Sequence, residues 1–183
     1  MKYSQAEKLQ LMMLCEIYRA MGIENSFNPD IVEEAISTDN YWALSWEYPS
    51  LETEDETPSK VKLFVDTVDM YDMLSYTYER LSDEDKKDVR EAVPHFSPEY
   101  SLTFPGFDGN NESEYMQIGR LLKTMGRFSG TELTKNSHCP SVETYRRMLD
   151  IFLPIRHKFV FNEGIRKQEL IDILLERIHP SNR

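Results

Sequence analysis

The sequence is poor in glycine and cysteine and has no long hydrophobic run. It has 7 glycines in 183 residues, which argues against phosphate-binding glycine loops and against folds of many hairpins, since both need glycine at special backbone positions. The two cysteines, Cys15 and Cys139, form no CxxC motif and indicate a reduced protein. No stretch of about 18 apolar residues is present, and the N-terminal segment lacks the apolar region of a signal peptide. We therefore expect a cytoplasmic protein without a membrane partner.

The motifs of the common catalytic classes are also missing. The sequence contains no GxSxG, GxxxxGK[ST], GxGxxG or HExxH, which argues against the corresponding hydrolases, nucleotide-binding proteins and zinc enzymes. The acidic and amide residues between Asp108 and Glu114 lack the spacing of an EF-hand loop, so turn and cap roles are favoured for them. The sequence predicts no cofactor and no bound metal. It favours a non-catalytic protein and leaves enzymatic activity open.

Charge is distributed unevenly along the chain, whose formal net charge is -11. Between Glu24 and Glu114 there are 23 acidic and only 6 basic side chains, whereas residues 134–183 carry 9 basic and 6 acidic ones. An acidic surface repels phosphate, so a nucleic-acid partner is disfavoured. Two interpretations remain open. The favoured one is a solvated acidic face, and the other is that acidic and basic regions meet between subunits.

Apolar residues recur at helical spacing through most of the chain. The sequence predicts an all-α fold in which residues 1–183 form a single-domain bundle of six to eight helices with irregular connectors. The longest helix is expected to begin at Thr57-Pro58 and to end near Leu81. Its apolar stripe is expected to consist of Val61, Phe64, Val65, Val68, Tyr71 and Tyr78. Short extended segments are expected at Tyr100–Phe104 or in "RHKFVF". Helix starts are marked by Ser4 with Glu7, Asn28 before Pro29, Ser82, Asn111 with Glu114, Ser141 and Asn162.

Two of the predicted helices are apolar around most of their circumference. The first lies at residues 4–21, and the second contains "LIDILLERI" near the C-terminus. A helix of this kind needs cover on several sides, either from its own domain or from another copy of the chain. These two segments favour self-association, and cover within the same domain stays open as the alternative.

Two arginine residues are better candidates for a binding site than the acidic residues between Asp108 and Glu114. Arg127 ends a helix at "GRFSG", and Arg147 lies in a helix whose apolar face is full. A guanidinium group pairs with carboxylate or phosphate through two hydrogen bonds. With Asp108 of the turn "GFDG", these residues form the candidate binding set. Structural roles are favoured for them, including an i, i+4 pair between Glu143 and Arg147.

Three aspartates suggest an alternative function. Asp66, Asp69 and Asp72 are spaced at i, i+3 and i+6 on one helix, so they fall within about 120° of arc. Such carboxylates hold a metal when another helix supplies partners, although the Glu-x-x-His signature of di-iron bundles is missing and a solvated face is favoured. The alternative is a small-molecule or metal-dependent enzyme that uses these aspartates, or Asp108 with Arg127.

Several segments resemble the bacterial YfbU family. They are "GFDGNNESEYMQIGRLLKTMGRF" at Gly106–Phe128, "YRRMLDIF" at Tyr145–Phe152, "AEKLQLMM" and "VDMYDML". The resemblance covers roughly residues 4–178 and departs around 46–60 and 94–104. It implies an all-α, oligomeric domain without an established activity. Members fused to a DNA-binding helix-turn-helix suggest a regulatory role by analogy. We expect a non-catalytic, homo-oligomeric interaction or ligand-sensing module, with an unidentified protein or small molecule as its further partner.

Overall fold

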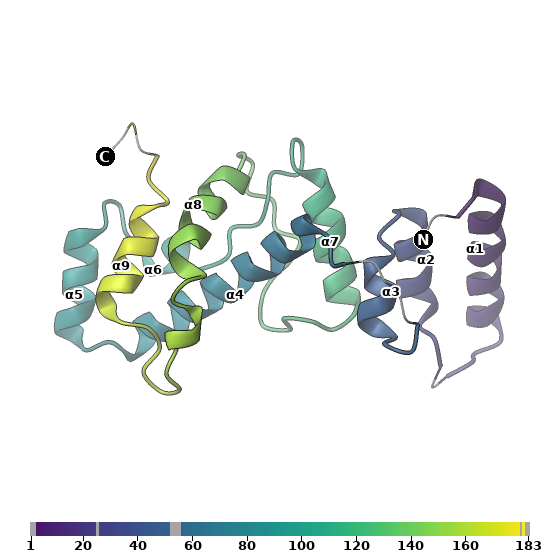
Figure 1. The fold of residues 1–183 in the computed structure, drawn as a ribbon, viewed down its shortest axis with the longest axis horizontal. Coiled ribbons are helices and arrows are strands. Elements are labelled where there is room, and N and C mark those ends of the chain that lie inside the picture. Colours follow the sequence, from purple (N-terminus) through teal and green to yellow (C-terminus); the bar gives the residue numbers. More distant parts are fainter. Residues whose placement is uncertain (1–2, 25, 52–55, 180, 182–183) are drawn as a thin grey trace.

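A computed structural model describes residues 3–24, 26–51, 56–179 and 181 of the chain. Within these ranges the chain forms helices and no strand, which confirms the all-α fold. Figure 1 shows an elongated molecule with α1 to α3 at one end and α5 and α9 at the other. The elements are α1 (Gln5–Ala20), α2 (Pro29–Ser37), α3 (Trp42–Glu47), α4 (Ser59–Arg80), α5 (Asp83–Ala92), α6 (Pro98–Ser101), α7 (Ser113–Thr124), α8 (Val142–Phe152), the 3-10 helix η1 (Arg156–Lys158) and α9 (Lys167–Leu175).

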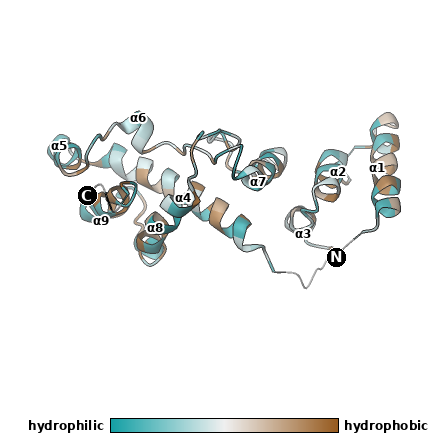
Figure 2. Cartoon of the chain, turned by 90° about the horizontal axis from the view of Figure 1, so that it is seen from above, coloured by the Kyte–Doolittle hydropathy of each residue, from teal (hydrophilic) through white to brown (hydrophobic). Residues whose placement is uncertain are grey.

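Helix α4 is the centre of the fold. It is the longest helix, with 22 residues, and α7, α8 and α9 pack against it. Seen from above, it runs between α6 and α7 on one side and α8 and α9 on the other (Figure 2). Five members of its predicted apolar stripe are buried and Val65 is half-buried, which agrees with the helical period. The five buried residues are Val61, Phe64, Val68, Tyr71 and Tyr78.

Local capping signals placed three helix starts correctly. Ser4 and Glu7 form the reciprocal capping box of α1. The Asn28 side chain accepts a hydrogen bond from the backbone N–H of Asp30 at the start of α2. The Ser82 side chain accepts one from the backbone N–H of Asp85 at the start of α5. In each case the cap and its donor lie within three residues, so the sequence alone determines the contact.

Two predicted caps and one predicted strand are wrong. Helix α7 begins after Glu112 instead of Asn111, and α9 begins after Arg166 instead of Asn162. Asn162 lies in a turn with φ of 75°. At Tyr100–Phe104 there is no strand, because Pro98 starts the short helix α6.

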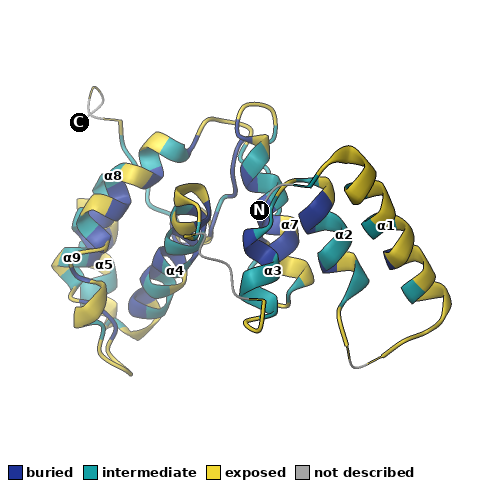
Figure 3. Cartoon of the chain, turned by 45° about the vertical axis from the view of Figure 1, so that its right-hand side comes forward, coloured by how far each residue is buried: buried dark blue, intermediate teal, exposed yellow. Residues whose placement is uncertain are grey.

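Helices α1, α2 and α3 form one end of the molecule. Helix α1 packs on α2, and α2 packs on α3 and α7. Figure 3 shows that much of α1 is exposed, whereas α2 carries a buried side. The Trp46 indole N–H donates to the Thr57 hydroxyl at 3.1 Å, which joins α3 to the start of α4. This arrangement covers only one side of α1.

Candidate functional site

Asp108 stabilises a turn. Its carboxylate accepts hydrogen bonds from the Asn111 side chain at 2.5 Å and from the backbone N–H of Asn110 at 3.0 Å. The Asn111 amide, followed by the Asn110 N–H, holds the pKa of Asp108 below its usual range. The residue is only 2 % exposed. Its local hydrogen bonds explain its burial without a bound ligand.

Glu112 is a buried residue whose contact with the start of α8 was not predicted from the sequence. One carboxylate oxygen accepts from the backbone N–H of Asp108 at 3.0 Å. The other accepts from the N–H groups of Ser141 at 2.8 Å and Val142 at 2.9 Å, at the start of α8. Glu112 therefore supplies the cap that the Ser141 side chain does not provide. Its donors at α8 lie 29 and 30 residues further along the chain, so a local cap pattern does not reveal them.

The turn before α7 is further held by the segment at residues 135–139. Phe107 and Asn136 form a parallel bridge, and the Asn136 side chain accepts from the backbone N–H of Gly109 and of His138. Gly106 has φ of 86°, and a Cβ atom there would lie 1.7 Å from the backbone oxygen of Lys135. Glycine is required at this position for both reasons. The turn "GFDG" is thus part of the architecture.

The structure does not bring Asp108, Arg127 and Arg147 together. Asp108 precedes α7 and Arg127 follows it, and no contact joins them in the described ranges. Arg127 Nη2 donates to the Trp46 carbonyl at 3.5 Å. Arg147 Nη2 donates to the carbonyl of Glu176, the C-cap of α9, at 3.2 Å.

The predicted Glu143–Arg147 pair takes a different form. Arg147 Nη1 donates to the backbone oxygen of Glu143 at 3.2 Å. The Glu143 carboxylate pairs instead with Arg146 at 2.7 Å. Arg147 therefore serves mainly to join α8 to the end of α9.

The three aspartates of α4 do share one face, but other side chains contact all three of them. Arg156 pairs with Asp66 at 2.8 Å and also with Asp69, and the Thr131 hydroxyl donates to Asp72 at 3.1 Å. Burial raises the pKa of both Asp69 and Asp72. A hollow of about 310 Å³ adjoins them. Among the residues that the structure describes, no three His, Cys, Asp or Glu side chains are placed to hold a metal. Within the described ranges, side chains of the same chain therefore contact each of the three aspartates.

The outer side of α1 is an uncovered apolar surface. We call Ala6, Leu9, Met13, Ile17 and Ala20 the outer stripe. They recur at intervals of three and four residues and are exposed, with Leu9 at 59 %, Met13 at 55 % and Ile17 at 52 %. A helix side with this period normally faces a packing partner.

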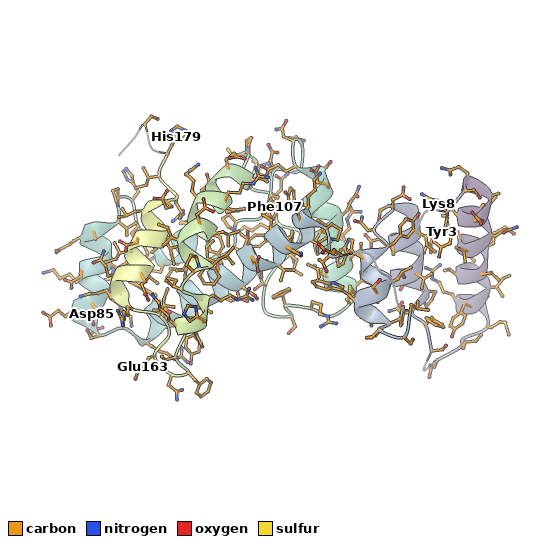
Figure 4. All side chains as sticks on the ribbon, in the orientation of Figure 1. Tyr3, Lys8, Asp85, Phe107, Glu163 and His179 are labelled. Carbon is orange, nitrogen blue, oxygen red and sulfur yellow. The ribbon has the colours of Figure 1, made fainter. Side chains whose placement is uncertain are left out.

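The basic residues of α1 turn towards the rest of the chain. Lys8 pairs with Asp39 at 2.6 Å, and it lies on the side of α1 that faces α2, as does Tyr3 (Figure 4). Arg19 pairs with Asp30 of α2 at 2.7 Å and also with Glu33. These ion pairs leave the outer stripe without a basic side chain.

An apolar cavity of about 270 Å³, partly open to solvent, lies beneath α1. It is bounded by side chains of α1, α2, α3 and the adjoining segments. One of its lining residues, Leu14, is also 58 % exposed beside the outer stripe. Helix α1 therefore carries the outer stripe and also forms part of the cavity wall. The lining includes Leu11, Cys15, Tyr18, Val32, Ile36, Leu44 and Tyr48.

None of the helices in the described ranges is both long enough and apolar enough to span a membrane. The fold and its surfaces thus define an all-α protein with an uncovered apolar first helix and an apolar cavity beneath it. The chain belongs to the YfbU family, because the sequence model of the YfbU domain matches residues 1–174.

Two curated relatives agree with this assignment. UPF0304 protein MJECS11 of Methanocaldococcus jannaschii is 26% identical over 128 residues, which are 66% of this chain and 70% of the relative. UPF0304 protein PM1500 of Pasteurella multocida is 26% identical over 156 residues, which are 82% of this chain and 88% of the relative. The resemblance noted in the sequence is therefore confirmed at the level of the family.

Proposed function

We propose that the protein is a non-catalytic, homo-oligomeric interaction module whose subunits associate through the outer stripe of α1. The observation that carries this proposal is the concentration of exposed apolar side chains at one end of the molecule. In the described ranges, twelve large hydrophobic residues are exposed. Eight of them fall between Leu9 and Leu51. Single exposed apolar residues are ordinary, but a contiguous apolar surface is typical of an interface.

The outer stripe suits a second copy of the same helix. Met13 is its middle, with Leu9 and Ile17 four residues away on either side and Ala6 and Ala20 seven residues away. The side chains of the stripe therefore have nearly the same order of sizes when the helix is read from either end. In an antiparallel pair related by a two-fold axis through Met13, Leu9 of each chain faces Ile17 of the other. A two-fold interface requires such self-complementarity.

Further exposed apolar residues lie at the same end of the molecule, and two of them, Phe27 and Leu51, line the cavity beneath α1. Ile23 and Phe27 follow α1 directly and are 43% and 48% exposed, and Leu51, after α3, is 42% exposed. A stable interface buries roughly 800 Å² on each partner, which is more than one short helix offers. The additional side chains at this end of the molecule supply further apolar area.

The test is the subunit number of the purified protein, measured by native mass spectrometry and by sedimentation at micromolar concentration. We expect the wild-type protein to be oligomeric. Met13→Glu places a charge in the centre of the outer stripe and should yield monomers with an unchanged circular dichroism spectrum. The matched control is Tyr100→Glu, because Tyr100 of α6 is 73% exposed. This variant should leave the subunit number unchanged. A monomeric wild-type protein would contradict the proposal.

A further inference from the structure

We infer that the cavity beneath α1 binds a small, mainly apolar molecule that carries one hydrogen-bonding group. This inference deepens the proposed function, and rests on it, by giving the module a ligand. The cavity measures about 270 Å³, whereas an apolar cavity of about 150 Å³ is large enough to bind benzene. The space therefore suits two fused rings or an aliphatic group of similar size.

The lining determines the chemical class of the ligand. Leu11 and Cys15 of α1, Val32 and Ile36 of α2, and Leu44 of α3 present aliphatic groups and a thiol to the cavity. The cavity lies between helices, a common place for small-molecule sites, and such sites combine apolar walls with few polar groups. Among the residues that the structure describes, no charged side chain lines the cavity. A strongly charged ligand would lose part of its hydration there, and these lining residues offer no charge that would compensate for the loss.

Tyr18 lines the cavity, and we assign the polar contact to its hydroxyl group. Its hydroxyl oxygen is buried, and within the described part of the chain it has no hydrogen-bond partner. The Tyr48 hydroxyl, in contrast, already accepts from the backbone N–H of Asn28 at 2.6 Å. A buried hydroxyl without a partner is unfavourable. A hydroxyl or carbonyl group on the ligand would satisfy Tyr18, so phenols, aromatic alcohols and small ketones are the class that fits.

The position of the cavity connects ligand binding to association. Helix α1 contributes Leu11, Cys15 and Tyr18 to the cavity and carries the outer stripe on its other side. A ligand in the cavity adds contacts between α1 and α2, so it favours the conformations in which α1 is held in place. Ligand binding is therefore expected to strengthen self-association.

The test uses 1-naphthol and naphthalene as probes, titrated into the full chain and followed by calorimetry and fluorescence. We expect 1-naphthol to bind the wild-type protein more tightly than naphthalene does. Tyr18→Phe should weaken 1-naphthol binding roughly 3- to 10-fold, as expected for one hydrogen bond, and should leave naphthalene binding unchanged. Cys15→Phe or Leu44→Phe should abolish binding of both probes by filling the cavity. The control Tyr100→Phe should change neither affinity.

Three results would overturn the inference. The first is that 1-naphthol does not bind the folded wild-type protein. The second is that both cavity-filling variants bind the probes as tightly as the wild-type protein does. The third is that Tyr18→Phe weakens the binding of 1-naphthol and of naphthalene by the same factor. The same titration on Met13→Glu separates this inference from the proposed function. Probe binding by a protein that is always monomeric would contradict self-association alone. An oligomer that Met13→Glu dissociates, but that binds no probe, would contradict the ligand site alone.

Discussion

Glu112 shows how one buried carboxylate joins two distant segments. It accepts three backbone hydrogen bonds, from the turn at Asp108 and from the start of α8. Glu112→Ala leaves these donors without their partner, so we expect a loss of about 2–4 kcal/mol in the free energy of unfolding. Urea denaturation followed by circular dichroism measures this loss.

Glu114 provides the matched control for that measurement. Its carboxylate pairs with Lys60 at 2.5 Å, but both side chains are exposed, and exposed ion pairs contribute little to stability. Glu114→Ala should therefore cost less than about 1 kcal/mol. If Glu112→Ala and Glu114→Ala had equal effects, the capping role of Glu112 would be wrong.

Asp69 and Arg156 predict a pH dependence of stability. Burial raises the pKa of Asp69, and the Arg156 charge opposes this rise. A carboxyl group whose pKa is higher in the folded state stabilises the protein at low pH, and this contribution is lost as pH rises through the folded-state pKa. Arg156→Gln removes the opposing charge. The destabilisation that it causes should therefore grow as pH rises from about 4 towards 7.

Urea denaturation at a series of pH values measures this dependence. Lys158→Gln is the control, because Lys158 pairs with Glu169 and not with the α4 aspartates. Its pH profile should run parallel to that of the wild-type protein. If the pH profile of Arg156→Gln also ran parallel to that of the wild-type protein, the pKa of Asp69 would not depend on the charge of Arg156.

The roles of individual residues were predictable where their partners are close in sequence. Ser4, Asn28 and Ser82 cap helices through contacts within three residues, and these were predicted. Glu112 and Arg147 contact groups about 30 residues away, and their partners follow only from the packing of whole helices. Asp108 was chosen for its turn context, but whether it faces solvent or its own turn depends on the segment that covers it.

At the scale of elements, the hydrophobic period was the reliable signal. It identified α4 and its buried residues Phe64, Val68 and Tyr71, because a buried helix face requires apolar residues at that spacing. The connectors were less predictable. Tyr100–Phe104 has strand-like residues, but Pro98 fixes a backbone angle that suits a helical first turn. The "RHKFVF" segment begins with the 3-10 helix at Arg156–Lys158 and is extended at Val160, which forms an antiparallel bridge with Gly164.

The pairing of two α1 helices makes a prediction about their register. In the proposed antiparallel pair, Leu9 of one chain faces Ile17 of the other. Leu9→Glu and Ile17→Lys should each weaken self-association when made alone. Mixing the two variants should restore association, because a Glu–Lys pair then forms across the interface. Native mass spectrometry of isotope-labelled mixtures detects the mixed oligomer.

Leu9→Glu mixed with itself is the matched control, since its acidic side chains then face only Ile17. A parallel arrangement would place residue 9 against residue 9. In that case the mixed variants would pair no better than either variant with the wild-type protein. That outcome would exclude the antiparallel register while leaving self-association intact.

At the scale of the whole molecule, the acidic and basic parts of the sequence meet within one chain. Arg156 contacts Asp66 and Asp69 of α4, and Lys167 contacts Asp85 and Asp88 of α5 at 2.6 and 2.5 Å. In these contacts, basic residues of the C-terminal part pair with acidic residues of the same subunit. Contacts between acidic and basic regions of different subunits are therefore not needed to pair these charges.

Association through an apolar surface and association through opposite charges predict different effects of salt. Each subunit carries a formal net charge of -11, so two copies repel each other, and salt screens repulsion beyond about 10 Å at 0.1 M. If the outer stripe holds the subunits together, raising sodium chloride from about 50 to about 500 mM should strengthen association or leave it unchanged. Sedimentation at several salt concentrations measures the dissociation constant. A weaker association at high salt would instead favour contacts between acidic and basic surfaces, and Met13→Glu would then have little effect on the subunit number.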